Sequence, residues 1–255
     1  MATVIHTEDL AVSFDGVIPV FEGLNISIEK GEFVTLVGVS GAGKSTLLRV
    51  IADLIPAFKG SVKVDVPHDP TRRPIAIVFQ AANLMPWRKV KDNVTLGLEG
   101  TELLDETKSE RVRWTLDLVG MGEYADRWPY QLSGGQRQRI GIARALAVDP
   151  DILLMDEPFG ALDAITRTAL QDELLRIWKE TGKSILFVTH DIEEAVFLGD
   201  RVLLLGDNPA RIVEEYRTTI DRSERRDSEA FQQQVARVRS GLEDTIKTTL
   251  ARDRT

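Results

Sequence analysis

The N-terminal third of the chain alternates hydrophobic and polar positions in the way that β-strands do. Residues 3–14 mix the two kinds before an Asp-Gly turn, and residues 24–28 alternate strictly, as a half-buried strand does. Residues 33–37 form a short apolar run of the kind found in buried strands. After a glycine-rich loop, residues 45–54 show helical spacing that ends before Pro56. The pattern predicts strands, a loop and a helix in that order.

The chain up to about residue 215 continues as alternating strands and helices, interrupted by one long helical stretch. Residues 61–79 have strand character, and longer charged segments at about 83–147 predict a helical insertion. Within the insertion, 110–119 and 136–148 have helical spacing. Strands are then expected at 152–155, 184–188 and 202–205, and helices at 162–180 and 192–197. Such alternation implies a parallel sheet that is flanked by helices.

Residues 221–255 form a tail with a different pattern. Its apolar residues recur three or four positions apart: Phe231, Val235, Val238, Leu242, Ile246 and Leu250. This spacing predicts an amphipathic helix. Its apolar stripe has two interpretations, a face packed on the helix's own domain or a contact surface for a dimer partner.

Composition excludes several classes of protein. The chain has 255 residues, enough to bury a core, and no cysteine, so a disulfide framework or a thiolate metal site is excluded. It holds only three histidines, and a zinc site is not expected. The net charge of −8 argues against a protein that binds nucleic-acid phosphates. There is neither an apolar run long enough to cross a bilayer nor a signal peptide, which predicts a soluble intracellular protein.

Residues 38–46 read GVSGAGKST and fit the phosphate-loop pattern G-x-x-x-x-G-K-S/T. The loop leaves a predicted buried strand and opens a predicted helix, which is the context that the pattern requires. Glycines let backbone N–H groups converge on phosphate oxygens, and the helix start adds its positive end. The candidate binding residues are Gly38, Ser40, Gly41, Ala42, Gly43, Lys44, Ser45 and Thr46.

Two of these side chains have expected roles. Lys44 should reach the β- and γ-phosphates, and the Ser45 hydroxyl should ligate Mg²⁺. The alternative is a glycine-rich turn with a solvated lysine.

An acidic pair follows the predicted strand at 152–155. Asp156 is placed to hold Mg²⁺ through water, and Glu157 to orient or deprotonate the attacking water. The alternative is a solvated pair in a turn before Pro158, but four apolar residues running directly into the pair favour the functional interpretation.

A second candidate anion site precedes the helix predicted at 136–148. Leu132 is followed by Ser133, Gly134, Gly135 and Gln136, which supply a hydroxyl, glycine N–H groups and a helix N-terminus. Each of the two anion sites holds only part of what hydrolysis needs. Two copies arranged head to tail would complete both.

These motifs, in this order, resemble those of the ATP-binding-cassette (ABC) ATPases over essentially residues 1–215. The resemblance implies an α/β P-loop NTPase fold with a mainly parallel core sheet, an N-terminal antiparallel β subdomain and an inserted α-helical subdomain at about 83–147. The ATPase domain would span 1–220 and the amphipathic tail 221–255.

The resemblance also assigns individual residues. Phe14 matches an aromatic that stacks on adenine, where Tyr is more usual, and Gln80 matches a glutamine that touches Mg²⁺ and the water. Asp163 belongs to a segment that crosses the dimer, and His190 matches a histidine that contacts the γ-phosphate. The alternative for His190 is a structural hydrogen-bond partner. Its position after a strand of a parallel sheet favours the ligand edge. The implied catalytic residues are Glu157, His190, Gln80 and Lys44.

Residues 79–98 resemble the same segment of importer ATPases for nitrate, sulfonates and taurine. In that family the segment forms a groove for a short helix of the membrane permease. Apolar Leu84, Met85 and Trp87 beside Arg88 would suit such a helix at 80–98. The alternative is a self-packed loop around Trp87.

The expected function is therefore an ATP-hydrolysing importer subunit that uses ATP and Mg²⁺. Its implied partners are a permease, a second ATPase subunit in a homodimer and, indirectly, an extracytoplasmic solute-binding protein, with no nucleic acid. It would be cytoplasmic and peripheral on the inner face of the membrane. The alternatives are a non-transport ABC ATPase acting on nucleic acid or the ribosome, and a binding module that uses ATP only as a switch; an exporter is disfavoured because no membrane span is fused to the cassette.

Overall fold

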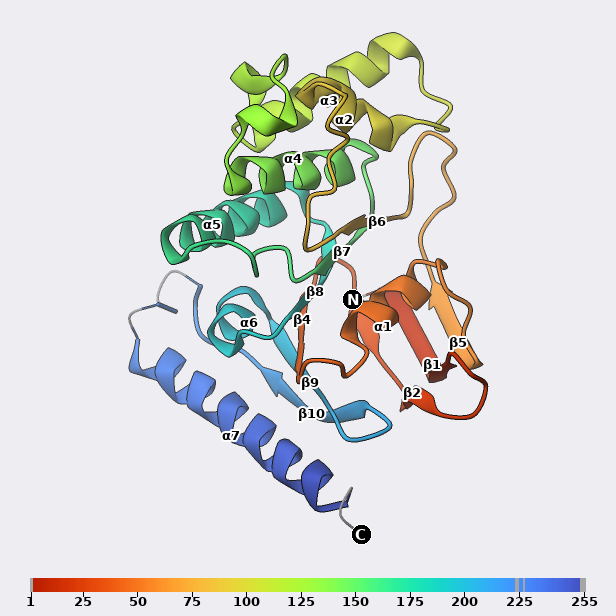
Figure 1. The fold of residues 1–255 in the computed structure, drawn as a ribbon, viewed down its shortest axis with the longest axis vertical. Coiled ribbons are helices and arrows are strands. Elements are labelled where there is room, and N and C mark those ends of the chain that lie inside the picture. The colour runs from red at the N-terminus through yellow and green to blue at the C-terminus, as the bar shows by residue number, and fades with distance from the viewer. Residues whose placement is uncertain (1, 223–224, 227, 253–255) are drawn as a thin grey trace. The chain divides into compact units, whose positions relative to one another are not determined.

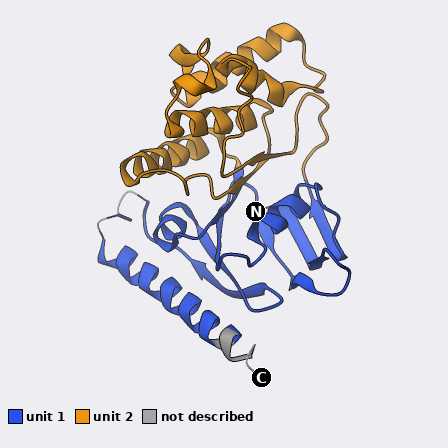
Figure 2. Cartoon of the chain, in the orientation of Figure 1, with its two compact units in different colours: residues 1–65, 184–255 blue, residues 66–183 orange. Residues whose placement is uncertain are grey.

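The chain folds into two compact units, residues 1–65 with 184–255 and residues 66–183 (Figure 2). The computed structural model describes residues 2–222, 225–226 and 228–252, except for the side chains of residues 248 and 250–252 (Figure 1). Each unit combines helices and strands, and the α/β class predicted from the sequence is confirmed.

The first unit begins with an antiparallel sheet. Its strands are β1 (Thr3–Ser13), β2 (Pro19–Leu24), β3 (Ser27–Glu29) and β5 (Lys59–Val64), in the order β2-β1-β3 with β5 also paired to β1. The continuous strand predicted at 24–28 is wrong, because the chain leaves the ladder at Asn25. The Asn25 amide donates to the Gly23 carbonyl oxygen and to the Asp9 carboxylate, at 3.1 and 3.2 Å, and so fixes a turn there.

A second sheet of this unit contains the parallel strands. β4 (Phe33–Gly38) lies between β8 (Ser184–Thr189) and β9 (Arg201–Gly206), and β10 (Arg211–Arg217) pairs antiparallel with β9. All residues of β4, β8 and β9 are buried, as their apolar runs predict. Helices α1 (Lys44–Ile51) and α6 (Ile192–Leu198) pack on these strands.

The amphipathic tail is the helix α7 (Glu229–Arg252), which contacts α6, β9 and β10 (Figure 1). Phe231, Val235 and Val238 are buried, and Leu242 and Ile246 are partly buried. The Leu250 side chain lies outside the described residues. The stripe thus packs on the helix's own unit. Within the described part of the chain, no helix is both long and apolar enough to span a bilayer.

The second unit surrounds a parallel pair of strands with helices. β6 (Ile75–Val78) pairs with β7 (Ile152–Asp156). The helices are α2 (Val90–Thr95), α3 (Asp105–Leu118), α4 (Gly134–Ala147) and α5 (Ala164–Thr181), with 3₁₀ turns η1 (Leu96–Leu98), η2 (Gly122–Tyr124) and η3 (Pro129–Gln131). α4 contacts α2, α3, α5 and β6 (Figure 1). It therefore positions most of this unit.

Candidate functional site

The glycine-rich loop follows β4 directly and has the backbone that glycine permits. Gly41 and Gly43 both have φ of +84°, in the left-handed region that other residues avoid. Gly38 is required for a different reason, because a Cβ there would lie 2.5 Å from the carbonyl oxygen of Leu205 on β9. The loop thus ends in Gly43, the N-cap of α1, so the first turn of the helix follows the loop directly.

Lys44 is held inside this loop. Its side chain is 5% exposed, and Nζ donates to the carbonyl oxygens of Gly38 and Val39 at 2.9 and 3.0 Å. The ammonium group therefore lies within the ring of the loop. The solvated-lysine alternative is wrong.

His190 follows the strand next to the loop. β4 and β8 are parallel with Val37 opposite Thr189, so Gly38 and His190 leave the same edge of the sheet. The buried Thr189 hydroxyl donates to Glu194 at 2.5 Å and accepts from the Asp191 N–H at 3.0 Å. These bonds fix the turn that carries the exposed His190.

Phe14 lies in the loop between β1 and β2, and the residue is 69% exposed. The neighbouring Asp15 carboxylate accepts hydrogen bonds from the backbone N–H groups of Ile18 and Val17 and from the Ser13 hydroxyl. These donors lower the pKa of Asp15 to about 2. The loop is therefore fixed while its aromatic ring faces solvent.

Gln80, Asp156 and Glu157 come together in the second unit. β6 and β7 are parallel with Val78 opposite Met155, so Gln80 and the acidic pair follow the same ends of neighbouring strands. Asp156 is 9% exposed. A Cβ on Gly160 would lie 3.3 Å from Gln80 Nε2 and 3.7 Å from Glu157 Oε2, so the amide and the carboxylate flank one small residue.

Glu157 has an unusual backbone. Its φ is +45°, in the left-handed region that costs a residue other than glycine about 1 kcal/mol or more. Non-glycine residues are held in this region mainly where the surroundings over-determine them, as happens at active sites. Asp156 is buried and Glu157 is partly buried, so the acidic pair is not an ordinary solvated turn.

Ser133–Gln136 form the start of α4. Ser133 is the N-cap, and its Oγ accepts from the Gln136 N–H at 3.2 Å while Gln136 Oε1 accepts from the Ser133 N–H at 2.9 Å. Gly135 is required by packing, since a Cβ there would lie 2.5 Å from Thr166 Cγ2 on α5. The first turn carries no carboxylate, which leaves the positive helix end suited to an anion.

Asp163 is the N-cap of α5, so the helix begins at Ala164 rather than at residue 162 as predicted. Its carboxylate accepts from the Thr166 N–H and hydroxyl at 3.0 and 2.7 Å. These two bonds lower the pKa of Asp163. Its role in the structure of the single chain is capping.

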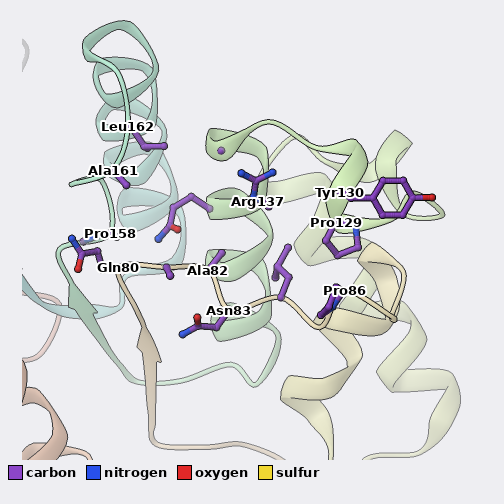
Figure 3. Close-up of a pocket in the computed structure, with 14 residues that line it drawn as sticks. Gln80, Ala82, Asn83, Pro86, Pro129, Tyr130, Arg137, Pro158, Ala161 and Leu162 are labelled. Atoms are coloured by element: carbon purple, nitrogen blue, oxygen red, sulfur yellow. The ribbon is translucent and has the colours of Figure 1, made fainter.

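A cavity of about 530 Å³ lies beside Gln80 (Figure 3). It is lined by the segment after β6, by the start of α4 and by the turn before α5; the residues drawn and labelled include Gln80, Asn83, Pro86, Tyr130, Arg137 and Leu162. The cavity thus lies between the Gln80 segment and the start of α4, whose N-cap is Ser133.

Side chains that the sequence analysis missed hold the Gln80 segment on α4. Gln138 Nε2 donates to the Phe79 carbonyl oxygen at 3.2 Å, and Arg144 donates to those of Ala82 and Asn83 at 2.6 and 3.0 Å. Both lie on α4, and Gln138 is buried. The sequence did offer one signal of these contacts, which is the polar residue Gln138 at a core-facing position of the predicted helix.

The segment 85–93 is organised around Asn93, also missed. This fully buried side chain accepts from the Met85 N–H at 2.7 Å and donates toward the carbonyl oxygens of Met85, Arg88 and Lys89. Trp87, in contrast, is 70% exposed. The self-packed loop around Trp87 is therefore wrong.

The structure divides the candidate residues between the units. The glycine-rich loop, Phe14 and His190 lie in the first unit, and Gln80, Asp156, Glu157, Ser133 and Asp163 lie in the second.

Comparison with known sequences gives a consistent result. A family profile described as ABC transporter matches residues 21–160. The chain is 46% identical over 199 residues to the taurine import ATP-binding protein TauB of Escherichia coli O157:H7, covering 77% of each chain. It is 52% identical over 188 residues to an aliphatic sulfonates import ATP-binding protein of Paracoccus denitrificans, covering 74% of this chain and 72% of the relative.

Solved structures resemble it as well. The cbiO1 protein of Clostridium perfringens, part of an ABC transporter complex, superposes with a TM-score of 0.76 at 27% identity, covering 86% of this chain and 90% of that one. The ATP-binding cassette MJ0796, solved as a dimer bound to ADP and Pi, superposes with a TM-score of 0.70 at 31% identity, covering 85% of this chain and all of that one.

Proposed function

The chain belongs to the ABC transporter family of ATP-binding proteins, whose ATP hydrolysis is coupled to transport, and we propose that it drives import of taurine, another sulfonate, nitrate or a related small solute. The names of its relatives support taurine and sulfonates within this range, and nitrate rests on the resemblance of residues 79–98. The transported solute crosses a separate permease, to which an extracytoplasmic solute-binding protein delivers it. The subunit works on the inner face of the membrane, in contact with that permease.

The working form is a head-to-tail dimer of two copies around two ATP molecules. Each ATP is held by residues 38–46 of one copy and by Ser133–Gln136 of the other. The reciprocal cap at Ser133 and the carboxylate-free first turn of α4 support this assignment, because they present a fixed, positive helix end. A similar cassette that is dimeric with ADP and Pi gives further support.

Hydrolysis uses a carboxylate, an ammonium group and an imidazole. Glu157 accepts a proton from the water that attacks the γ-phosphorus, while Lys44 and His190 stabilise the charge that develops on the phosphoryl oxygens. The strained backbone of Glu157 and the buried ammonium of Lys44 support these roles. Phe14 stacks on the adenine, and Asp163 lies across the dimer from the partner's loop.

Magnesium fits the donors that we assign to it. Ser45, Gln80 and Asp156 offer hydroxyl, amide and carboxylate oxygens, which are the hard ligands that this ion prefers. Among the residues that the structure describes, no three His, Cys, Asp or Glu side chains could hold a metal by themselves. Mg²⁺ usually keeps several waters and shares phosphate oxygens with one or two protein ligands. When bound, it neutralises phosphate charge in the transition state.

The permease docks at residues 80–98. The exposed Trp87, the cavity beside Gln80 and the bonds that fix residues 79–83 to α4 support this position. A movement of α4 would carry the Gln80 segment with it. The start of α4 binds nucleotide in the dimer, so nucleotide binding and docking share one rigid element.

The placement of Lys44 within its glycine loop carries the proposal, and reconstitution tests it. The chain and the membrane protein that co-purifies with it are inserted into vesicles, and ATP hydrolysis and uptake of taurine, an alkanesulfonate and nitrate are measured. Glu157→Gln should keep ATP binding and lower both rates about 10²-fold or more. Glu180→Gln, which removes a surface partner of Arg176, is the matched control. Near-normal hydrolysis by Glu157→Gln would remove Glu157 from its role.

A further inference from the structure

The Asp15 carboxylate holds the loop between β1 and β2, beside a contact of the Ser13 hydroxyl with the Ile18 carbonyl oxygen at 2.9 Å. Asp15 Oδ1 accepts from the backbone N–H groups of Val17 and Ile18, both at 2.9 Å, and from the Ser13 hydroxyl at 2.8 Å. Hydrogen bonds to an ionised acceptor are stronger than bonds between neutral groups. One side chain therefore ties both ends of residues 13–18 together.

The same loop leaves large apolar side chains in solvent. Phe14, Val17 and Ile18 are 69%, 80% and 68% exposed. A loop of this composition gains free energy by collapsing onto the protein, which would bury these side chains. The bonds to Asp15 oppose that collapse, because they hold the backbone on both sides of Phe14.

We propose that Asp15 is a positioning residue for nucleotide binding, which keeps Phe14 presented to the base. This inference rests on the proposed function, in which Phe14 stacks on adenine. Ordering a loop at the moment of binding costs affinity, and a loop that is already fixed avoids that cost. Asp15 itself touches neither the base nor the phosphates in this role.

The test compares ATP with inorganic triphosphate, which carries the phosphates but no base. Asp15→Ala should weaken ATP binding about tenfold and leave triphosphate binding unchanged, both measured by calorimetry on the full chain. Asp15→Asn keeps an oxygen acceptor and should recover most of the affinity for ATP. A tenfold loss corresponds to about 1.4 kcal/mol.

A matched control is available elsewhere in the chain. Asp69 makes the same kind of turn, accepting from the Thr71 N–H and hydroxyl at 2.8 and 2.6 Å. Asp69→Ala removes one backbone and one side-chain hydrogen bond of the same kinds outside the nucleotide loop. It should leave the affinity for ATP and for triphosphate unchanged.

Phe14→Ala separates failure of this inference from failure of the proposed function. If Phe14→Ala leaves ATP affinity unchanged, the stacking role of Phe14 is wrong. If Phe14→Ala weakens ATP binding and Asp15→Ala does not, the positioning role of Asp15 is overturned. An equal loss of ATP and triphosphate affinity in Asp15→Ala would also overturn it, because that result indicates general damage. The double variant should bind ATP no more weakly than Phe14→Ala alone, since both act through one ring.

Discussion

Ser133 and Gln136 cap each other at the first turn of α4. Each residue accepts a hydrogen bond from the backbone N–H of the other, at 3.2 Å to Ser133 Oγ and 2.9 Å to Gln136 Oε1. The turn that we assign to the partner's ATP is therefore already ordered in a single chain. Little conformational entropy remains to be lost there when the dimer closes.

Ser133→Ala removes the N-cap and should lower the free energy of unfolding by about 1 kcal/mol. Ser133→Thr keeps a hydroxyl at the cap and should cost much less. Chemical denaturation of the full chain measures both. Equal stability of Ser133→Ala and the native chain would show that the cap contributes nothing.

Gly38 and Gly41 are required for different reasons, and alanine substitutions should separate them. At Gly38 the added methyl group would lie 2.5 Å from the Leu205 carbonyl oxygen, so β4 or β9 must shift. We expect this shift to lower the free energy of unfolding by about 2 kcal/mol or more. At Gly41 the space is open and only the φ of +84° opposes alanine, which costs about 1 kcal/mol. Thermal unfolding of both variants gives the comparison. Equal melting temperatures would contradict the close approach of Gly38 to β9.

Asn93→Ala should disorder the segment that presents Trp87. The substitution removes the acceptor of the Met85 N–H and the donor to nearby carbonyl oxygens. If these backbone groups stay buried, the free energy of unfolding should fall by about 1–3 kcal/mol. Binding of the permease should weaken, whereas ATP affinity should stay unchanged. Co-purification with the permease measures the first effect and calorimetry the second. Trp87→Ala tests the exposed ring itself. If both variants bind the permease as the native chain does, docking at residues 80–98 is wrong.

The Asp15 carboxyl should titrate at about pH 2, well below its ordinary value of 3.8. Its pKa is lowered in the folded chain, so its contribution to stability is fully present above pH 3.8 and is lost as pH falls through about 2. The loop around Phe14 should thus keep its structure down to about pH 3. The carboxyl ¹³C shift of Asp15, assigned by comparison with Asp15→Asn, gives the pKa. A midpoint near 4 would show that the three hydrogen bonds are not formed in solution.

The sequence predicted the elements whose signals are local. Apolar runs identified β4, β7, β8 and β9, and the glycine loop identified the start of α1, because buried strands and phosphate loops have distinctive compositions. β10 was missed because it lies at the edge of the sheet and exposes charged residues. Interpreting it as a strand requires knowledge of its partner.

Long-range polar contacts could also not be predicted from the sequence. Arg225 belongs to a charged tail, yet it is buried and donates to the carbonyl oxygens of Val196, Phe197 and Gly199, where α6 ends. Burial lowers the pKa of Arg225 to about 10. Arg144 likewise bonds to residues about 60 positions away in the chain. Such partners depend on the tertiary fold, and neither periodicity nor spacing predicts them.

Because Glu157 has a left-handed backbone, stability and the proposed activity favour different residues at this position. Glycine, asparagine or aspartate would relieve the strain there, since they tolerate a φ of +45° better than glutamate does. Each of them would remove or shorten the side chain that we assign to the attacking water. Selection for folding alone would thus drive this position away from glutamate. The backbone strain at Glu157 would then accompany the carboxylate that we assign to turnover.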